Sequence, residues 1–245
     1  LFIVDELARK QRSETSGEGS DGSTTIPSRT DCDEAAQDER QMKLIMENWR
    51  GYLAEAMKTL EDLPDDLYIG IVDEGGENVH FYYSDEEGND TDFYDDPVSG
   101  MVSITRPQTR KQAWGDKEEP EGACDGAWVI SSTEATKGWG PLLYDIAIEW
   151  ATENGEGLTP DRFAVSPDAA KVWDYYLTKR SDVGADQLDD LENSLTEPEE
   201  DNCAQDSAKD YAGDKWADTP LSKKYTKAPT TLAQLRKMGK IRERS

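Results

Sequence analysis

Basic residues, histidine and long apolar runs are all scarce in this 245-residue chain. Only 27 lysines and arginines stand against 53 acidic residues, so the formal net charge at pH 7 is −26. This charge excludes a protein that binds nucleic acid or anionic membranes nonspecifically. No apolar run approaches the roughly 20 residues that a membrane-spanning helix needs. The composition therefore predicts a soluble, cytoplasmic protein.

Cysteine is scarce too. The three cysteines are Cys32, Cys124 and Cys203, far apart and without a CxxC pair, and the single histidine is His80. This pattern predicts neither a disulfide framework nor a metal site, and it favours a reducing compartment. The chain starts at Leu1, and LFIVDELARKQR lacks the basic start and the apolar core of a signal peptide. We expect a processed or truncated start.

Composition divides the chain into three parts. Residues 1–41 are predicted to be a flexible N-terminal extension, because 13–41 are rich in Ser, Gly and acid and have few apolar anchors. Residues 42–180 are the predicted domain. Residues 181–245 are predicted to be a solvated acidic segment followed by a basic tail, since 181–219 hold 13 acidic and 2 basic residues while 221–245 hold 8 basic ones and Glu243. Both extensions are expected to be disordered, and the tail to fold back on the acidic segment.

Apolar periodicity predicts the elements of the domain. An imperfect helical stripe covers 42–61, and two β-rich runs flank the glycine turn of DEGGEN as a hairpin. Residues 106–126, with Pro107, Pro120 and Gly122, are predicted to be a loop. The expected strands are 67–72, 79–84, 101–105, 127–132 and 163–166, and the expected helices are 141–152 and one that begins at Pro167. The fold class is α/β (α+β), with a mixed, mostly antiparallel sheet and flanking helices.

The pattern predicts a strand, a short glycine loop and an amphipathic helix, in that order, in the stretch AWVISSTEATKGWGPLLYDIAIEWATENG. Gly138 and Gly140 let the backbone approach a ligand closely, and the first amides of a helix favour an anion. Lys137 is the cation of this loop. The pattern is typical of a phosphate-binding turn, although a tight turn with no ligand would look the same.

This stretch resembles the acyl-CoA-binding segment of the GNAT acetyltransferase superfamily, in which a strand leads into a Q/RxxGxG/A loop that holds the pyrophosphate of coenzyme A. LTPDRFAVSPDAAKVWDYYL is similar to the strand and helix that follow in that family. The resemblance covers roughly residues 65–180 in element order and 127–177 in motif. It implies acetyl-CoA as cofactor. The implied cofactor-binding residues are Ile130, Ser131, Lys137, Gly138, Trp139 and Gly140, the first two through backbone amides that polarise the thioester.

The resemblance also implies direct attack of an amine on the thioester, with a base for the amine and an acid for the leaving thiolate. Glu134 is the candidate base, and Tyr176 and Tyr175 are the candidate acids. The alternatives are a surface carboxylate for Glu134 and simple packing for the two tyrosines. His80, in a hairpin, is interpreted as structural. The acidic run 84–96 lacks the spacing of a calcium loop and is interpreted as a solvated loop.

Three functions remain open at this point. The first is an acetyl-CoA-dependent N-acetyltransferase acting on a small-molecule or protein amine. The second is a non-catalytic virion or assembly protein on the same fold, because Ala135 stands where the family has Gln or Arg and Trp173 stands where it has Tyr. A faint resemblance to N-terminal segments of tailed-phage proteins also appears in MKLIMENWRGYL at 42–53. If the protein is phage-encoded, it is expected to act in the host cytoplasm or in the virion. In the virion it would have virion partners. The third is an acidic binding module.

Overall fold

The computed structural model describes residues 57–92, 96–107, 109–111, 118–191, 193–197 and 202–244. These residues build an eight-stranded mixed sheet with the strand order β10-β1-β2-β3-β6-β7-β9-β8. Only the pairs β1 with β10 and β6 with β7 are parallel, so the predicted mostly antiparallel sheet is confirmed. Its strands are β1 (Tyr68–Glu74), β2 (Asn78–Ser84), β3 (Gly100–Thr105), β6 (Trp128–Ala135), β7 (Leu158–Thr159), β8 (Val183–Gln187), β9 (Lys223–Lys227) and β10 (Ile241–Arg244).

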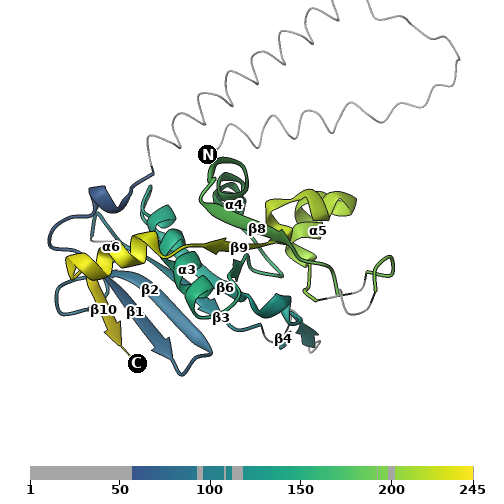
Figure 1. Cartoon of the computed structure of the whole chain (residues 1–245), viewed down its shortest axis with the longest axis horizontal. Coiled ribbons are helices and arrows are strands. Elements are labelled where there is room, and N and C mark those ends of the chain that lie inside the picture. The colour runs from purple at the N-terminus through teal and green to yellow at the C-terminus, as the bar shows by residue number, and fades with distance from the viewer. Residues whose placement is uncertain are drawn as a thin grey trace, which may run out of the picture. The chain divides into compact units, whose positions relative to one another are not determined.

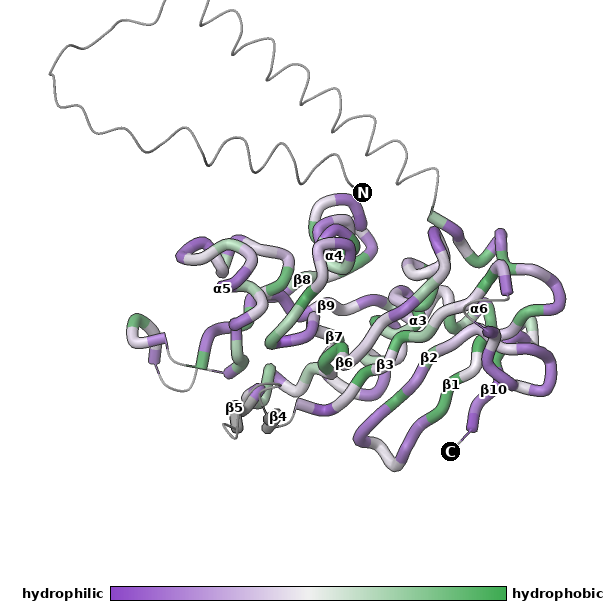
Figure 2. The backbone as a smooth tube through the Cα atoms, turned by 180° about the vertical axis from the view of Figure 1, so that it is seen from behind, coloured by the Kyte–Doolittle hydropathy of each residue, from purple (hydrophilic) through white to green (hydrophobic). Residues whose placement is uncertain are grey.

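The predicted hairpin forms between β1 and β2. Gly75 and Gly76 have φ of +72° and +81°, which suits glycine, and the Gly76 N–H donates to Asp73 Oδ1 at 2.7 Å. Hydrophilic and hydrophobic stretches follow one another along this hairpin when it is seen from behind (Figure 2), and Ile69, Ile71, Val79 and Phe81 are buried in one core. One face of the hairpin is thereby buried against a helix.

Three helices pack around the sheet: α3 (Gly140–Glu153), α4 (Pro167–Lys179) and α6 (Thr230–Met238). Helices α3 and α6 lie across the same face (Figure 1). Two edge-on aromatic pairs join this face to α3 and the turn before it: Phe81 with Trp150, ring centroids 5.8 Å apart, and Tyr83 with Trp139, 5.6 Å apart. The core therefore lies between this face and α3, and Trp150 is buried in it, as predicted.

The parallel unit β6–α3–β7 forms, but its second strand differs from the predicted one. The prediction of a strand at 163–166 is wrong, because the strand at this place in the sheet, β7, is Leu158–Thr159. Asp161 explains the difference: its Oδ1 accepts the N–H groups of Phe163 at 2.8 Å and Ala164 at 3.0 Å. These two backbone N–H groups are therefore hydrogen-bonded within a turn and do not pair with a neighbouring strand.

Residues 181–245 are not an extension of the domain, and the predicted boundary at 180 needs correction. Strands β8, β9 and β10 belong to the main sheet, and helix α5 (Asp206–Ala212) lies between β8 and β9 in sequence. The acidic segment 181–219 was expected to be solvated, but Leu188, Cys203 and Ala208 within it are buried. A small number of well-placed apolar side chains anchors a segment whose average composition is acidic.

A disulfide joins Cys124 to Cys203, so the expectation of no disulfide is wrong and the inference of a reducing compartment loses its premise. Two backbone bonds bring the cysteines together: Cys124 N–H to Asn202 O at 2.7 Å and Ala204 N–H to Glu121 O at 2.8 Å. The cysteines are 79 positions apart, so no local sequence pattern predicts this disulfide.

The remaining predictions concern the N-terminal part and the loop at 106–126. The extension 1–41 and most of the helix predicted at 42–61 lie outside the described residues, while Leu60–Asp62 form a 3-10 turn. Within the predicted loop, β4 (Thr109–Lys111) pairs with β5 (Glu118–Pro120) as a separate two-stranded sheet.

Candidate functional site

The candidate site begins where β6 and β7 part. These strands pair only at Trp128 with Leu158 and Val129 with Thr159. Beyond that point β6 continues to Ala135, paired with β3 alone among the described strands, and the chain after β7 turns away. A cavity of about 170 Å³ lies between them. Its lining residues are 130–133 of β6, Tyr144 of α3, Asp161 and 164–166 of the turn, and Ala169 and Trp173 of α4.

The part of β6 that borders the cavity carries a β-bulge. Ser103 of β3 pairs with Ser132 and Ile104 pairs with Ile130, which leaves Ser131 as the extra residue. A bulge locally disrupts the ladder and reorients backbone groups. The two residues that the resemblance names as amide donors, Ile130 and Ser131, therefore lie at this irregularity and line the cavity.

Tyr144 is the phenol that lines the cavity, and sequence reasoning missed it. Its hydroxyl donates to Thr133 Oγ1 at 3.5 Å, and its ring meets Trp173 edge-on with centroids 5.3 Å apart. Burial raises the pKa of Tyr144, so the phenol stays protonated near neutral pH and its O–H is a hydrogen-bond donor. Its position in the sequence, one helical turn after Gly140, is the signal that could have identified Tyr144 as a residue of the site.

The glycine loop leads from β6 into α3 as predicted. Gly138 has φ of +89°, and the Trp139 N–H donates to Thr136 O at 3.0 Å, which closes a turn just before the helix. The indole of Trp139 is buried in the core, and the backbone carbonyl of Trp139 accepts a hydrogen bond from the Tyr83 hydroxyl at 2.7 Å. Trp139 therefore contributes packing, and neither its side chain nor its N–H is available to a phosphate.

A second lysine accompanies Lys137 at this loop. The Lys58 N–H donates to Gly138 O at 2.9 Å, which places residue 58 beside the turn. Its ammonium is half-exposed and lies 3.7 Å from Asp62 Oδ1. Gly140 has no positive φ, and a Cβ added there would make an ordinary contact with Ala135 at 3.6 Å. Space therefore remains at the helix start.

Glu134, the expected base, does not reach the cavity. Glu134 is exposed and pairs with Met101 of β3. Its side chain lies on the sheet face opposite α3. Its neighbour Thr133 points to the α3 face, where it meets Tyr144.

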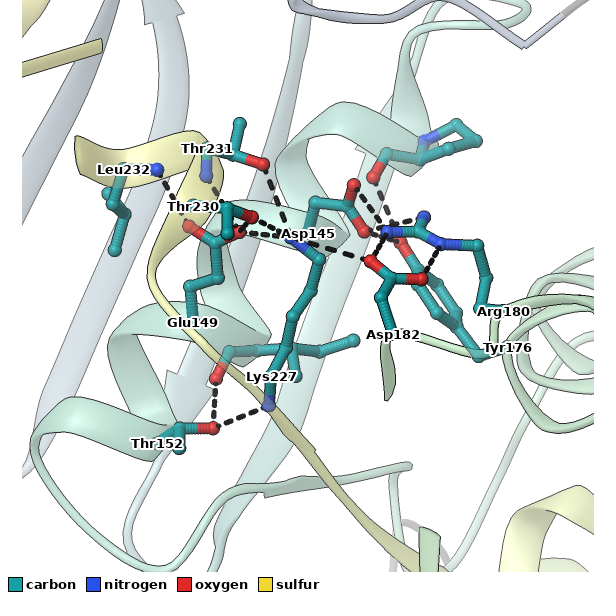
Figure 3. Close-up of polar contacts among 12 residues, drawn as sticks. Asp145, Glu149, Thr152, Tyr176, Arg180, Asp182, Lys227, Thr230, Thr231 and Leu232 are labelled. Carbon is teal, nitrogen blue, oxygen red and sulfur yellow. Dashed lines mark hydrogen bonds and ion pairs between the residues drawn. The ribbon is translucent and has the colours of Figure 1, made fainter. Parts of the chain in front are cut away.

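The two expected acids also lie outside the cavity lining. Tyr176 is buried, and its hydroxyl bonds to Asp145 Oδ1 at 2.8 Å and Pro141 O at 3.0 Å (Figure 3). Burial and the Asp145 carboxylate raise its pKa well above the usual value. Tyr175 packs edge-on against the Tyr176 ring. Both tyrosines pack as the alternative interpretation expected.

Tyr176 belongs to a network of charges that ties α3 to α4 and β8. Arg180 bonds to Asp145 at 2.9 and 3.1 Å and to Asp182 at 2.8 Å (Figure 3). The Arg180 guanidinium lowers the pKa of Asp182 to about 2. This network is structural because its groups satisfy one another.

The described residues hold no group of three or more His, Cys, Asp or Glu side chains that could bind a metal ion, and no helix among them is long and apolar enough to cross a membrane. Comparisons with protein-family models, with curated proteins and with solved structures find no match to this chain.

Proposed function

We propose that this protein is an acetyl-CoA-dependent N-acetyltransferase that acts on an amine. The observation that carries the proposal is the separation of the parallel strands β6 and β7 around a cavity, with the bulge at Ser131 on its wall. The resemblance of the sequence to the GNAT superfamily assigns the thioester-polarising amides to this same place. Two independent features, one of sequence and one of geometry, thus support one site.

In this proposal the acetyl thioester lies in the cavity with its carbonyl against the backbone of Ile130 and Ser131. The pyrophosphate lies at the start of α3, where the first N–H groups lack intrahelical acceptors and Lys137 and Lys58 supply positive charge. Tyr144 protonates the leaving thiolate in place of Tyr176, because it lines the cavity and holds its proton.

A thermal shift with acetyl-CoA tests the proposal. Acetyl-CoA at ~100 times its dissociation constant should stabilise the fold by about 2.7 kcal/mol. Gly140→Glu adds a negative charge where the pyrophosphate should lie and should abolish the shift. Gly140→Ala is the matched control, because the structure accepts a Cβ there. An unchanged melting temperature of the native protein in millimolar acetyl-CoA would refute the proposal.

One observation favours the second candidate, a non-catalytic GNAT-like virion or assembly protein. The expected acid Tyr176 is engaged with Asp145 and Pro141 O and does not line the cavity. If acetyl-CoA binds but no tested amine causes release of the coenzyme A thiol, the result would support this alternative.

A further inference from the structure

The cavity between β6 and β7 is lined by a single charged side chain. Among the described residues of the lining, Asp161 alone carries a charge, and the other polar residues carry hydroxyls. Arg162, the next residue, is fully buried outside the lining, where its guanidinium donates to Pro160 O and Leu221 O. A negative charge in a partly enclosed space attracts a cation and repels an anion. The lining therefore favours a positively charged group of a ligand.

The cavity has a buried aromatic part and an exposed rim. Tyr144 and Trp173 are buried, whereas Ser131 and Ser166 are exposed. Asp161 is partly exposed, so a ligand that enters from solvent can reach it. Methylene groups gain free energy by packing on buried apolar side chains, while charged groups prefer positions near the rim. An alkyl chain that carries charged ends suits this arrangement.

The turn after β7 fixes the carboxylate of Asp161. Its Oδ1 accepts the N–H groups of Phe163 at 2.8 Å and Ala164 at 3.0 Å, and Ala164 itself lines the cavity. The backbone carbonyl of Asp161 is directed to α5, because it accepts the Ser207 hydroxyl at 2.7 Å. The part of Asp161 that borders the cavity is therefore its carboxylate. A carboxylate offers about four acceptor sites, and these two N–H groups share one of its oxygens.

The strand register places Asp161 across the cavity from the proposed thioester position. Val129 and Thr159 form the last pair of the two parallel strands. Ser131 and Asp161 each lie two residues beyond this pair, and both line the cavity. They therefore lie on opposite walls, farther apart than the roughly 4.8 Å between paired strands. A ligand needs a chain of a few methylene groups to reach from one wall to the other.

We propose that the acetyl acceptor is a diamine or polyamine, and that Asp161 binds the positively charged nitrogen that does not react. This inference rests on the proposed function. A carboxylate favours the charged form of an ammonium that it contacts, so the nitrogen held by Asp161 stays protonated and has no lone pair for attack. The attacking nitrogen is therefore the one at the far end of the chain, near Ser131.

The transfer itself follows from this placement. The uncharged nitrogen forms a bond to the acetyl carbonyl carbon, the C–S bond breaks, and the thiolate takes the Tyr144 proton. The nitrogen loses its proton to solvent at the exposed rim, and solvent returns a proton to Tyr144. Asp161 is a specificity-determining residue in this scheme, because it selects the acceptor and exchanges no proton.

The test must separate Asp161 from the general attraction of a chain with a net charge of −26 for any polycation. Asp161→Asn keeps a side-chain oxygen that can accept the Phe163 and Ala164 N–H groups, and it removes the charge. Asp174→Asn is the matched control. Asp174 is exposed on α4 and follows Trp173 in sequence, but it does not line the cavity.

Kinetics compare putrescine, butylamine and γ-aminobutyrate as acceptors, with thiol release as the readout. Beyond the attacking nitrogen these amines carry an ammonium, a methyl group and a carboxylate, respectively. A hydrogen bond to a charged group should make kcat/KM for putrescine about 10- to 100-fold higher than for butylamine, and γ-aminobutyrate should be the poorest acceptor. Asp161→Asn should remove this preference by raising KM for putrescine, with the acetyl-CoA melting shift retained. Asp174→Asn should keep the preference.

Calorimetry makes the same comparison without turnover, in protein saturated with S-ethyl coenzyme A, which has no acetyl group to transfer. Putrescine should bind to the native protein and to Asp174→Asn with similar affinity, and at least about 10-fold more weakly to Asp161→Asn. Equal affinity in the three proteins, or a preference for putrescine that persists in Asp161→Asn, would overturn the inference and leave the proposed function intact. No melting shift with acetyl-CoA would remove the proposed function itself.

Discussion

The buried ion pair of Lys227 with Glu149 should contribute strongly to the stability of the fold. Both side chains are buried, at 3% and 0% exposure, and they join β9 to α3 (Figure 3). The Glu149 carboxylate also accepts the Thr231 N–H at 2.9 Å and the Leu232 N–H at 2.6 Å, so it caps the start of α6 from another helix. No side chain of α6 itself caps that end.

Lys227→Met keeps the volume and removes the charge, which leaves a buried carboxylate without its cation. Breaking such a pair costs about 3–5 kcal/mol. We expect a value near the lower end, about 3 kcal/mol, because the Thr230 hydroxyl and the two N–H groups still satisfy Glu149. Glu149→Gln should cost about 5 kcal/mol, since it leaves the ammonium buried and weakens the cap as well.

Urea unfolding followed by tryptophan fluorescence measures these changes. The double variant should cost less than the sum of the two single changes, by about 1–3 kcal/mol, because the two groups interact directly. Lys171→Met, at an exposed pair with Asp168, is the matched control and should change stability by less than about 1 kcal/mol. A cost for Lys227→Met that matches this control would refute the argument that the pair anchors the C-terminal strands.

Three further predictions concern the disulfide, the charge network and the proposed acid. Cys203→Ser should lower the unfolding free energy by up to about 4.5 kcal/mol, from a closed loop of 79 residues, as urea unfolding with and without reductant will show. Asp182 has its pKa lowered from 3.8 to about 2, so its stabilisation is present above pH 4 and is lost as the pH falls toward 2. Because Asp182 is half-exposed, the difference between native protein and Asp182→Asn should be about 0.5–1 kcal/mol at pH 7, and should vanish below about pH 2. Tyr144→Phe should slow thiol release about 10²-fold without changing the acetyl-CoA melting shift.

Local patterns predicted the first half of the sheet well. The hairpin at DEGGEN, the strand near 101–105 and the strand–loop–helix at 127–152 all depend on residues close together in sequence, and each is present. The C-terminal strands depend on distant partners: β10 pairs with β1, and β9 lies between β7 and β8. Composition marked this region as acidic and then basic, but its charges are paired across the fold, as Lys227 is with Glu149. A mean over a window cannot show such pairing.

The candidate site was predictable at its backbone and not at its side chains. The glycine loop follows from the order strand, loop, helix in the sequence, and Ile130 and Ser131, which the family resemblance implied, line the cavity. The acid required a choice among phenols, and the family pattern pointed to α4. On that helix Ala169 and Trp173 line the cavity, while the Tyr176 hydroxyl bonds to Asp145.

The phenol that meets the cavity comes from α3 instead, and this is a consequence of helix phase. Tyr144 lies four residues after Gly140, so it lies on the helix face that begins at the glycine loop. Its hydroxyl meets Thr133, which alternates with the outward-facing Glu134 on β6. The same alternation that removes Glu134 from the cavity therefore brings Thr133 and Tyr144 together in it. If Tyr144 supplies the proton, Thr133→Val, which removes the partner hydroxyl, should lower the rate less than Tyr144→Phe does. An equal or larger loss in Thr133→Val would mean that the hydroxyl of Thr133, and not the phenol, serves the leaving group.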